Sequence, residues 1–389
     1  WGIETGELRF AFEKMMQRKD AVIERLRQGV AFLLKAGKID HYKGLGTVHK
    51  DRTVSVQLDD AKEEMKADHV ILATGSHPAL PPIPGLDTVD AYTSDTIFNI
   101  EKIPQSLTII GGGVIGVELA CVFASLRTDV TIVEMADRLI PGEDPDAVKV
   151  LTKALRRKNI RMYTGAKVTK VMDEDGMKKV SIETKNGEIT HLASEQLLVA
   201  TGREPNSSGI DALGLKKDGP FIAVNDRLET SIPHIYAVGD LIGGWQLAHV
   251  ASAEGLVAAA NTAGKGETIT YRVVPRCVYT QPEIASVGLT EEEATKRGYR
   301  IKVQTFHFAN NGKALALDEK EGFAKIIAEE QYGEILGVVM VGPHVTEMIS
   351  EASAFMYLEG TVEELASMIH PHPTVTETLY EAAMAWLDK

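Results

Sequence analysis

Cysteine is scarce in this sequence, and basic charge is not in excess. Only two of the 389 residues are cysteine, Cys121 and Cys277, which excludes a disulfide scaffold and fits a reducing compartment. Asp and Glu outnumber Lys and Arg by 55 to 42, so the net charge is −13. That balance argues against nucleic acid or an anionic membrane surface as the main partner. We therefore expect a cytoplasmic protein that binds neither.

A long uninterrupted hydrophobic run is also lacking. The longest apolar stretch, residues 107–126, carries Glu118 near its centre and four glycines. An unpaired carboxylate at mid-bilayer is costly, so a strand, a glycine turn and a helix explain this stretch better than a membrane helix. Residues 1–30 do not show the basic start and apolar core of a secretory signal. We therefore expect no membrane association.

The order of apolar patterns predicts an α/β protein with more than one domain. At about 150 residues per domain, the length suggests two or three domains. Residues 10–36 show three- and four-residue apolar spacing, which predicts an amphipathic helix. From residue 107 strands and helices alternate as in a parallel sheet, and residues 270–389 mix them as in an α+β unit. The Pro-rich segment 78–84 is a candidate connector between domains.

A glycine-rich turn at residues 111–116 is the first candidate site. Its spacing is Gly-x-Gly-x-x-Gly between a predicted strand and a predicted helix, which lets backbone and helix N-terminus approach a pyrophosphate. Glu134 ends the next predicted strand, where its carboxylate would accept hydrogen bonds from the adenosine ribose and repel a 2′-phosphate. This combination predicts a dinucleotide site that prefers NAD to NADP. The alternative is a structural glycine turn beside a solvated glutamate.

The second candidate is Asp240, which with Gly239 follows a predicted strand at 234–238. An aspartate at the carboxyl end of a strand can bind the sugar or ribityl hydroxyls of a second cofactor. The same side chain could instead cap the following helix. The residues alone leave both interpretations open.

The third candidate is residues 369–377, which contain two histidines and a carboxylate. Pro373 fixes the turn after His372, and Glu377 falls in the first turn of the next predicted helix. A neighbouring carboxylate sets the tautomer and orientation of a histidine and stabilises its protonated form, as an acid–base catalyst requires. Most surface His–Glu neighbours are not catalytic, so the pair alone does not decide its role. His370 and His372 lack a third ligand at useful spacing, and we expect no metal site.

Taken in order, these motifs resemble the flavin-dependent pyridine nucleotide–disulfide oxidoreductases over residues 1–389. Glu134 and the His-Pro-His-Pro-Thr ending are most similar to the branch that oxidises dihydrolipoamide with NAD, rather than to NADP-linked glutathione-reducing relatives. The segments that carry the resemblance are Ala73–Ser76, Gly111–Glu118, Glu134, Ala200–Arg203, Tyr236–Asp240, Leu247–His249, Pro282-Glu283 with Val287-Gly288, and His372–Thr374 with Glu377.

The resemblance implies two cofactors, FAD and NAD, and a set of residues for each. His372 would be the acid–base catalyst, oriented by Glu377. The NAD contacts would be Gly111, Gly112, Gly113, Val114, Ile115, Gly116, Val117, Glu118, Glu134, Val168 and Gly202. The FAD contacts would be Gly46, Thr74, Gly75, Ser76, Asp240, Gln246, Leu247, Ala248 and His249.

The resemblance also implies a fold and an assembly, namely Rossmann-like FAD- and NAD(P)-binding domains followed by an α+β dimerisation domain. Residues 1–102 and 223–269 would form an incomplete FAD domain, 103–222 the NAD domain and 270–389 the dimerisation domain. A homodimer is implied, because the family delivers this histidine to the active site of the partner subunit. The substrate would be dihydrolipoamide on the acyltransferase component of a 2-oxo acid dehydrogenase complex.

Two family features do not occur within these residues. One is the first Gly-x-Gly-x-x-Gly, which binds the FAD pyrophosphate, and the other is the Cys-x-x-x-x-Cys redox pair on the helix that follows. Cys121 and Cys277 have no such spacing and are interpreted as structural thiols. We expect a truncated form of an NAD-dependent enzyme that is inactive by itself. The alternatives are a non-catalytic nucleotide-binding dimer and another NAD-linked flavin disulfide reductase.

Overall fold

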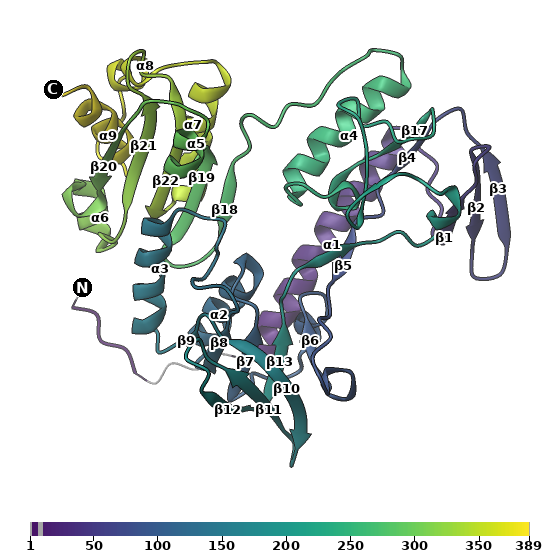
Figure 1. Ribbon diagram of the computed structural model, residues 1–389, viewed down its shortest axis with the longest axis horizontal. Helices are drawn as coiled ribbons and strands as arrows, with labels where there is room; N and C mark the ends of the chain where they lie inside the picture. The colour runs from purple at the N-terminus through teal and green to yellow at the C-terminus, as the bar shows by residue number, and fades with distance from the viewer. Residues whose placement is uncertain (1, 7–10, 389) are drawn as a thin grey trace. The chain divides into compact units, whose positions relative to one another are not determined.

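The computed structural model describes residues 2–6 and 11–388, and the chain divides into two compact units (Figure 1). Unit 1 takes in residues up to 77 together with 98–103 and 203–269. Unit 2 takes in 78–97, 104–202 and the chain from 270 onward. Each unit is therefore assembled from separated stretches of sequence.

Unit 1 begins with a long helix, α1 (Phe12–Ala36), close to the prediction of 10–36; Phe10 lies outside the described residues. None of the residues Phe12–Ala36 is buried, and apolar side chains such as Leu26 and Leu33 are each 68% exposed. The segment with three- and four-residue apolar spacing is thus a helix as predicted, because helical periodicity is a property of the local sequence. Most of its apolar side chains are not covered by the described parts of this chain.

The rest of unit 1 consists of short strands and one further helix. An antiparallel meander comprises β1 (Leu45–Val48), β2 (Thr53–Gln57) and β3 (Lys62–Lys66). Strand β4 (Val70–Leu72) pairs in parallel with β17 (Ile235–Ala237), and β5 (Ser76–Pro78) pairs with β14 (Arg203–Pro205). The remaining elements are β15 (Lys217–Asp218), β16 (Phe221–Ile222), η3 (Asp211–Leu213), η4 (Gly239–Ile242), η2 (Ile97–Asn99) and α4 (Ala248–Thr262).

The first half of unit 2 is a parallel sheet with strand order β6-β13-β7-β8-β9. Strands β7 (Ser106–Ile110) and β8 (Asp129–Val133) are nearly fully buried, as central parallel strands are when both faces are covered. Helices α2 (Val114–Ser125) and α3 (Pro145–Arg157) follow these two strands. The other strands are β6 (Tyr92–Thr93), β9 (Arg161–Tyr163) and β13 (Gln196–Val199), with η1 (Leu86–Thr88) before them and a meander of β10 (Lys167–Glu174), β11 (Met177–Glu183) and β12 (Ile189–Ser194).

The second half of unit 2 is an antiparallel sheet with strand order β18-β19-β22-β21-β20. Its central strands β21 (Phe323–Glu329) and β22 (Ile335–Gly342) are almost entirely buried. The edge strands are β18 (Arg276–Val278) and β20 (Ile301–His307), and β19 (Glu283–Gly288) lies between β18 and β22. The helices are α5 (Glu291–Lys296), α6 (Gly312–Leu317), α7 (Val345–Tyr357), α8 (Val362–Ser367) and α9 (Glu377–Leu387), with η5 (Phe308–Asn310). The predicted α/β fold with a C-terminal α+β part is confirmed.

The boundaries of the compact units fall at other residues than the predicted domain boundaries. Residues 78–97 belong to unit 2, because Tyr92–Thr93 adds β6 to the parallel sheet beside β13. Residues 203–222 belong to unit 1, where Arg203–Pro205 pairs with β5. The division into four domain segments itself stays a prediction.

A helix able to cross a bilayer would have to be both long and apolar. None of the helices within residues 2–6 and 11–388 meets both conditions.

Candidate functional site

The glycine-rich turn joins the end of β7 to the start of α2. Gly111 has φ +109, and a side chain there would collide with the carbonyl oxygen of Ala200. A side chain at Gly116 would collide with the carbonyl oxygen of Gly111. Both glycines are therefore required by the close approach of strand, turn and helix.

Gly113 differs from its neighbours in the turn. It has φ −70, and a Cβ placed on it would meet no atom within 4 Å. The fold of the chain therefore does not require glycine at this position. The open space lies at the N-terminus of α2, where unpaired backbone N–H groups favour an anion. This fits a pyrophosphate, and Val114, Ile115 and Val117 form the first turn of the same helix.

Glu134 follows β8 directly and turns back to the glycine-rich turn. Its Oε2 accepts a hydrogen bond from the backbone N of Gly112 at 2.5 Å, and its Oε1 accepts one from Ala136 N at 2.6 Å. Each carboxylate oxygen retains a further lone pair for a ligand donor. The structure thus holds this carboxylate beside the turn, unlike the solvated glutamate of the alternative interpretation.

The remaining residues of the predicted NAD set, Glu118, Gly202 and Val168, have different surroundings from one another. Glu118 is half-buried on α2, where burial raises the pKa of its carboxyl, and its Oε1 accepts a hydrogen bond from Tyr279 N at 2.8 Å. Gly202 has φ +132 and its carbonyl accepts a hydrogen bond from Ala79 N. Val168 packs into the core beneath β7 and β8 and is only 9% exposed, which leaves little side-chain surface for a ligand.

In unit 1, the predicted FAD residues gather where β4 and β17 end. The hydroxyl of Ser76 donates to Oδ2 of Asp240 at 2.5 Å, and Nε of Arg203 donates to the Ser76 hydroxyl at 2.6 Å. Asp240 lies inside η4, whose N-cap is Val238, so the alternative interpretation of Asp240 as a helix cap is wrong. Its position beside Ser76 was visible only in the fold, and the role of Arg203 as its neighbour was missed by sequence reasoning.

Other members of the FAD set surround this pair. Thr74 donates its hydroxyl proton to the carbonyl of Asn206 at 2.6 Å, and Gly75 has φ +68 with open space at its Cβ position. The Nε2 of Gln246 is buried without a hydrogen-bond partner, which fits a site built to receive a ligand acceptor. Leu247, Ala248 and His249 form the start of α4.

Gly46 is placed in another part of unit 1, on β1 of the meander. Its carbonyl oxygen lies so close to Gly209 that only glycine fits at position 209. Gly239, by contrast, lies beside Asp240 and donates its backbone N–H to Glu254, a buried carboxylate on α4. Sequence reasoning missed Glu254, because nothing in its surroundings on an Ala-rich helix marks it.

The C-terminal histidine segment forms two separate His–Glu pairs. Nδ1 of His372 lies 2.9 Å from Oε1 of Glu377, and the side chain of His372 is 78% exposed. Oε2 of Glu377 accepts a hydrogen bond from Thr374 N at 2.8 Å. This bond, followed by the one with His372, holds the pKa of Glu377 below its usual value. Because a carboxylate only accepts, Nδ1 carries the proton and Nε2 remains a base.

His370 is buried, with a side chain only 3% exposed. Its Nε2 lies 2.7 Å from Oε1 of Glu351 and its Nδ1 lies 3.1 Å from the carbonyl oxygen of Met368. Both ring nitrogens are therefore engaged within the protein. In the part of the chain that the structure describes, no three His, Cys, Asp or Glu side chains come together in a metal-binding group.

The two cysteines lie in protected surroundings. Cys121 is buried on α2 and Cys277 is partly buried on β18. Burial raises the pKa of both thiols, which disfavours the reactive thiolate. This agrees with their interpretation as structural thiols.

Comparison with known proteins gives a consistent family. Residues 4–255 match the pyridine nucleotide-disulphide oxidoreductase family, and residues 274–383 match the dimerisation domain of that family. The chain is 42% identical to a dihydrolipoyl dehydrogenase of Bacillus subtilis, with 99% of the chain and 84% of that protein covered. It is 37% identical to a dihydrolipoyl dehydrogenase of Chlamydia muridarum, covering all of the chain and 83% of that protein.

Solved structures agree with this match. LpdA of Mycobacterium tuberculosis has a TM-score of 0.90 at 25% identity, over 98% of this chain and 85% of that one. The HOCl-induced flavoprotein disulfide reductase RclA of Escherichia coli has a TM-score of 0.88 at 27% identity, over 96% of this chain and 86% of that one. The matched dimerisation domain supports a homodimer. The predicted resemblance and the cofactors that it implied, FAD and NAD, are confirmed. The chain belongs to the pyridine nucleotide-disulphide oxidoreductase family.

Proposed function

We propose that this chain belongs to a dihydrolipoyl dehydrogenase, which oxidises dihydrolipoamide to lipoamide and reduces NAD. The observation that carries the proposal is the His372–Glu377 pair, a surface histidine held at Nδ1 with Nε2 left as a base. The identity to dihydrolipoyl dehydrogenases over nearly the whole chain supports it. The reaction also needs a redox-active disulfide, and residues 1–389 contain only Cys121 and Cys277. That disulfide would be supplied by residues outside this sequence.

Two groups of residues fit the cofactors of this reaction. For NAD, the open position at Gly113 and the carboxylate of Glu134 would receive the pyrophosphate and the adenosine ribose. For FAD, Asp240 and the unpaired Nε2 of Gln246 would face polar atoms of the cofactor. When bound, FAD supplies the redox chemistry that links a dithiol to NAD.

The residues of this chain would move a proton at the dithiol. A dithiol must lose a proton before its thiolate attacks a disulfide. Nε2 of His372 would accept that proton, while Glu377 keeps the ring in place and stabilises the imidazolium. The imidazolium would then stabilise a thiolate left on the enzyme. In a homodimer, this histidine would complete the active site of the partner subunit.

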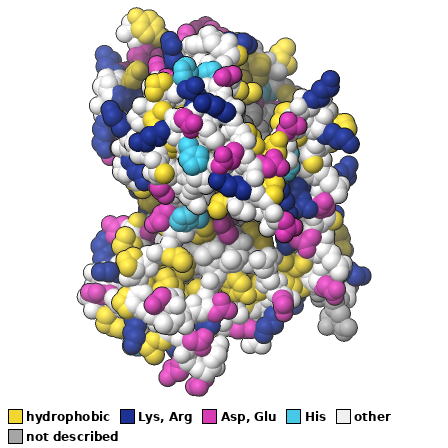
Figure 2. Space-filling view, turned by 90° about the vertical axis from the view of Figure 1, so that its right-hand side faces the viewer, with side chains coloured by type: hydrophobic (Ala, Val, Ile, Leu, Met, Phe, Trp, Pro, Cys, Tyr) yellow, Lys and Arg dark blue, Asp and Glu magenta, His cyan; other side chains and the backbone are white. Residues whose placement is uncertain are grey.

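The partner we propose is the acyltransferase component of a 2-oxo acid dehydrogenase complex, which carries dihydrolipoamide. The net charge of −13 suits docking to a basic segment of such a component. On the face shown in Figure 2, acidic and basic side chains are interspersed rather than separated by sign. That face therefore does not present a broad acidic docking patch.

A second candidate function is a nucleotide-binding dimer without catalysis. The observation that favours it is the absence of a Cys-x-x-x-x-Cys pair from residues 1–389. Such a protein would bind NAD at the glycine-rich turn but would not oxidise dithiols.

A chimera separates the two candidates. The part of the B. subtilis relative that precedes the matched region is placed before residue 1, and flavin content, NAD binding and dihydrolipoamide–NAD activity are measured. We expect dihydrolipoamide–NAD activity that His372→Gln lowers by about a hundredfold or more. A chimera that holds FAD and NAD but remains inactive would contradict the dehydrogenase and favour the non-catalytic dimer.

A further inference from the structure

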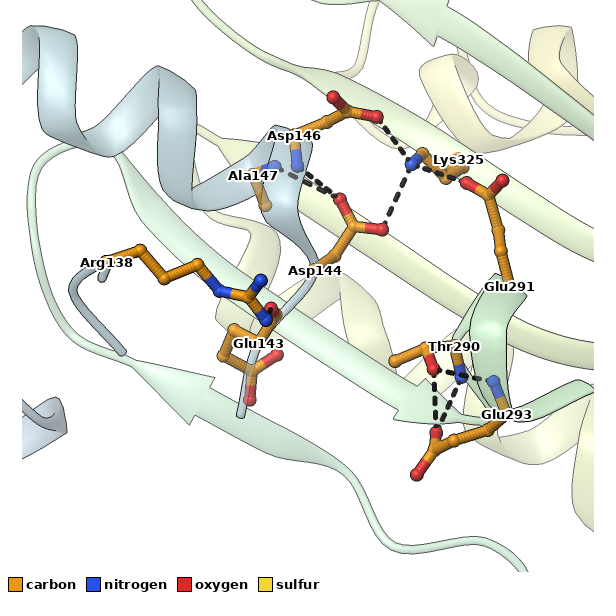
Figure 3. Close-up of polar contacts among 9 residues, drawn as sticks. All are labelled: Arg138, Glu143, Asp144, Asp146, Ala147, Thr290, Glu291, Glu293 and Lys325. Carbon is orange, nitrogen blue, oxygen red and sulfur yellow. Dashed lines mark hydrogen bonds and ion pairs between the residues drawn. The ribbon is translucent and has the colours of Figure 1, made fainter. Parts of the chain in front are cut away.

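Lys325 lies on the buried strand β21 and points toward the segment that precedes α3 (Figure 3). Its side chain is only 5% exposed, and its Nζ makes ion pairs with three carboxylates, two at the start of α3 and one at the start of α5. These are Asp144 at 3.0 Å, Asp146 at 2.9 Å and Glu291 at 2.8 Å. One lysine of the antiparallel sheet thus holds the N-terminus of the helix that connects β8 and β9 of the parallel sheet.

The residue before Asp144 is held in the same way. Glu143 is buried, and its Oε1 pairs with Nε of Arg276 on β18 at 3.0 Å. Its Oε2 accepts a hydrogen bond from the hydroxyl of Ser286 on β19 at 2.6 Å. Glu143 and Asp144 are therefore bound by side chains of three strands of one sheet, β18, β19 and β21. We call residues 134–144 the ribose loop, because they begin at Glu134 and end at these fastened residues.

The middle of the ribose loop contacts the glycine-rich turn. The backbone N–H of Ile140 donates to the carbonyl of Gly112 at 2.9 Å. Leu139 is 1% exposed, and its Cδ2 lies only 2.6 Å from the place that a Cβ on Gly112 would take. At the start of the loop, Glu134 accepts the N–H of the same glycine. Gly112 is thus held by both its N–H and its carbonyl to one loop.

The ion pairs of Lys325 keep its side chain charged although it is buried. Burial alone would lower the pKa of Lys325, but hydrogen bonds to Glu291, Asp146 and Asp144 outweigh it and leave that pKa above its usual value. Lys325 therefore stays charged at physiological pH. Removing one partner of a buried ion pair leaves an uncompensated charge, which is strongly destabilising locally. Asp144 also caps α3 by accepting the N–H groups of Asp146 and Ala147, so its position fixes where the helix starts.

We propose that Lys325 is a positioning residue for NAD: through Asp144 it holds the ribose loop in the place where the loop supports Gly112 and Glu134. The inference rests on the proposed binding of NAD at the glycine-rich turn. Its consequence is that NAD meets a preformed site. When only a fraction of molecules holds the loop in place, the apparent Kd rises by the inverse of that fraction, while kcat at saturating NAD stays unchanged.

The main experiment replaces Lys325 by Met in the full 389-residue chain and titrates NAD by calorimetry. We expect the Kd for NAD to rise about tenfold, as for a loop in place in roughly a tenth of molecules. The Kd for ADP-ribose should rise by the same factor, because the ribose loop would contact the adenosine half that ADP-ribose shares with NAD. Lys325→Arg keeps the charge and should restore most of the affinity. Hydrogen exchange at residues 139–143 should become faster in Lys325→Met and stay near that of the unmodified chain in Lys325→Arg.

The matched control is Glu321→Gln. Glu321 pairs with Arg157 at the other end of α3, so this variant also removes an ion pair between α3 and the C-terminal part of unit 2. It should leave both the Kd for NAD and the exchange of residues 139–143 unchanged. Ser286→Ala, which removes one hydrogen bond of Glu143, is the milder variant and should give a smaller change in the same direction.

The outcomes separate this inference from the proposed site. Lys325→Met that unfolds cooperatively and binds NAD like the unmodified chain overturns the inference and leaves the nucleotide site intact. An unmodified chain that does not bind NAD overturns the nucleotide site and the inference together. If Lys325→Met does not fold, Ser286→Ala decides, and unchanged Kd and exchange in that variant overturn the inference.

Discussion

Oε1 of Glu377 lies 2.9 Å from Nδ1 of His372, while the other oxygen of the same carboxylate accepts the N–H of Thr374 at 2.8 Å. The carboxylate is thus fixed at the first turn of α9 before it meets the ring. His372 is thereby oriented by a group that is itself held by backbone. A side chain that is 78% exposed keeps a defined tautomer in this way.

His372→Gln should slow dithiol oxidation by about a hundredfold or more, the range that general acid–base catalysis supplies. The physical reason is that the amide cannot take the thiol proton. Stopped-flow measurement in the chimera with a redox disulfide follows the dithiol half-reaction. Reduction of the flavin by NADH should survive, since hydride transfer needs no such base. Dithiol reduction at the unmodified rate would remove His372 from the mechanism.

Glu377→Gln should lower the free energy of unfolding by about 1 kcal/mol at neutral pH, the size of one hydrogen bond. The pKa of Glu377 is lowered in the folded chain, so its contribution is present above its usual value of 4.5 and is lost as pH falls through the lowered pKa. Denaturant unfolding at several pH values should therefore show the two chains converging in acid. Glu381→Gln, an exposed change on the same helix, serves as the control. A difference that grows toward acid pH would contradict the assignment.

Gly113→Ala should weaken the affinity for NAD by at least about tenfold, or about 1.4 kcal/mol, and should leave the free energy of unfolding unchanged. A Cβ there meets no protein atom, so only a bound pyrophosphate would be displaced. Gly116→Ala is the matched variant, because its Cβ collides with Gly111 and should cost about 1–3 kcal/mol of folding free energy. Calorimetry and thermal unfolding of both variants distinguish the effects. Normal NAD affinity in Gly113→Ala would mean that the pyrophosphate does not bind at this helix N-terminus.

Glu134→Ala should reduce NAD affinity by about 1–3 kcal/mol, because ribose hydroxyls lose their acceptor. The preference for NAD over NADP should shrink at the same time, since the charge that repels a 2′-phosphate is gone. Asp137→Asn changes an exposed carboxylate of the same loop that pairs with Lys185, and should have little effect. Titration with both nucleotides checks the prediction. Equal affinity for NAD and NADP in the unmodified chain would count against Glu134 as the ribose acceptor.

Local spacing in the sequence was enough to predict the glycine-rich turn and the His372–Glu377 pair. Glycines at Gly-x-Gly-x-x-Gly spacing between a strand and a helix have few other arrangements, because the helix must start close to the strand end. His372 and Glu377 are five residues apart, and the intervening turn brings them together. Helix α1 was predicted for the same reason, since its periodicity is a local property.

Contacts between residues far apart in the chain could not be predicted before the fold was known. Lys325 and Asp144 are 181 positions apart, and Ser76 and Asp240 are 164 apart. No periodicity links such residues, because their meeting depends on which strands become neighbours in a sheet. The burial of His370 against Glu351 and the exposure of the apolar side chains of α1 were hidden for the same reason. Short motifs that could bind a nucleotide or move a proton are local and can be predicted from the sequence, whereas the distant charges that hold those motifs in place meet only when the sheets form.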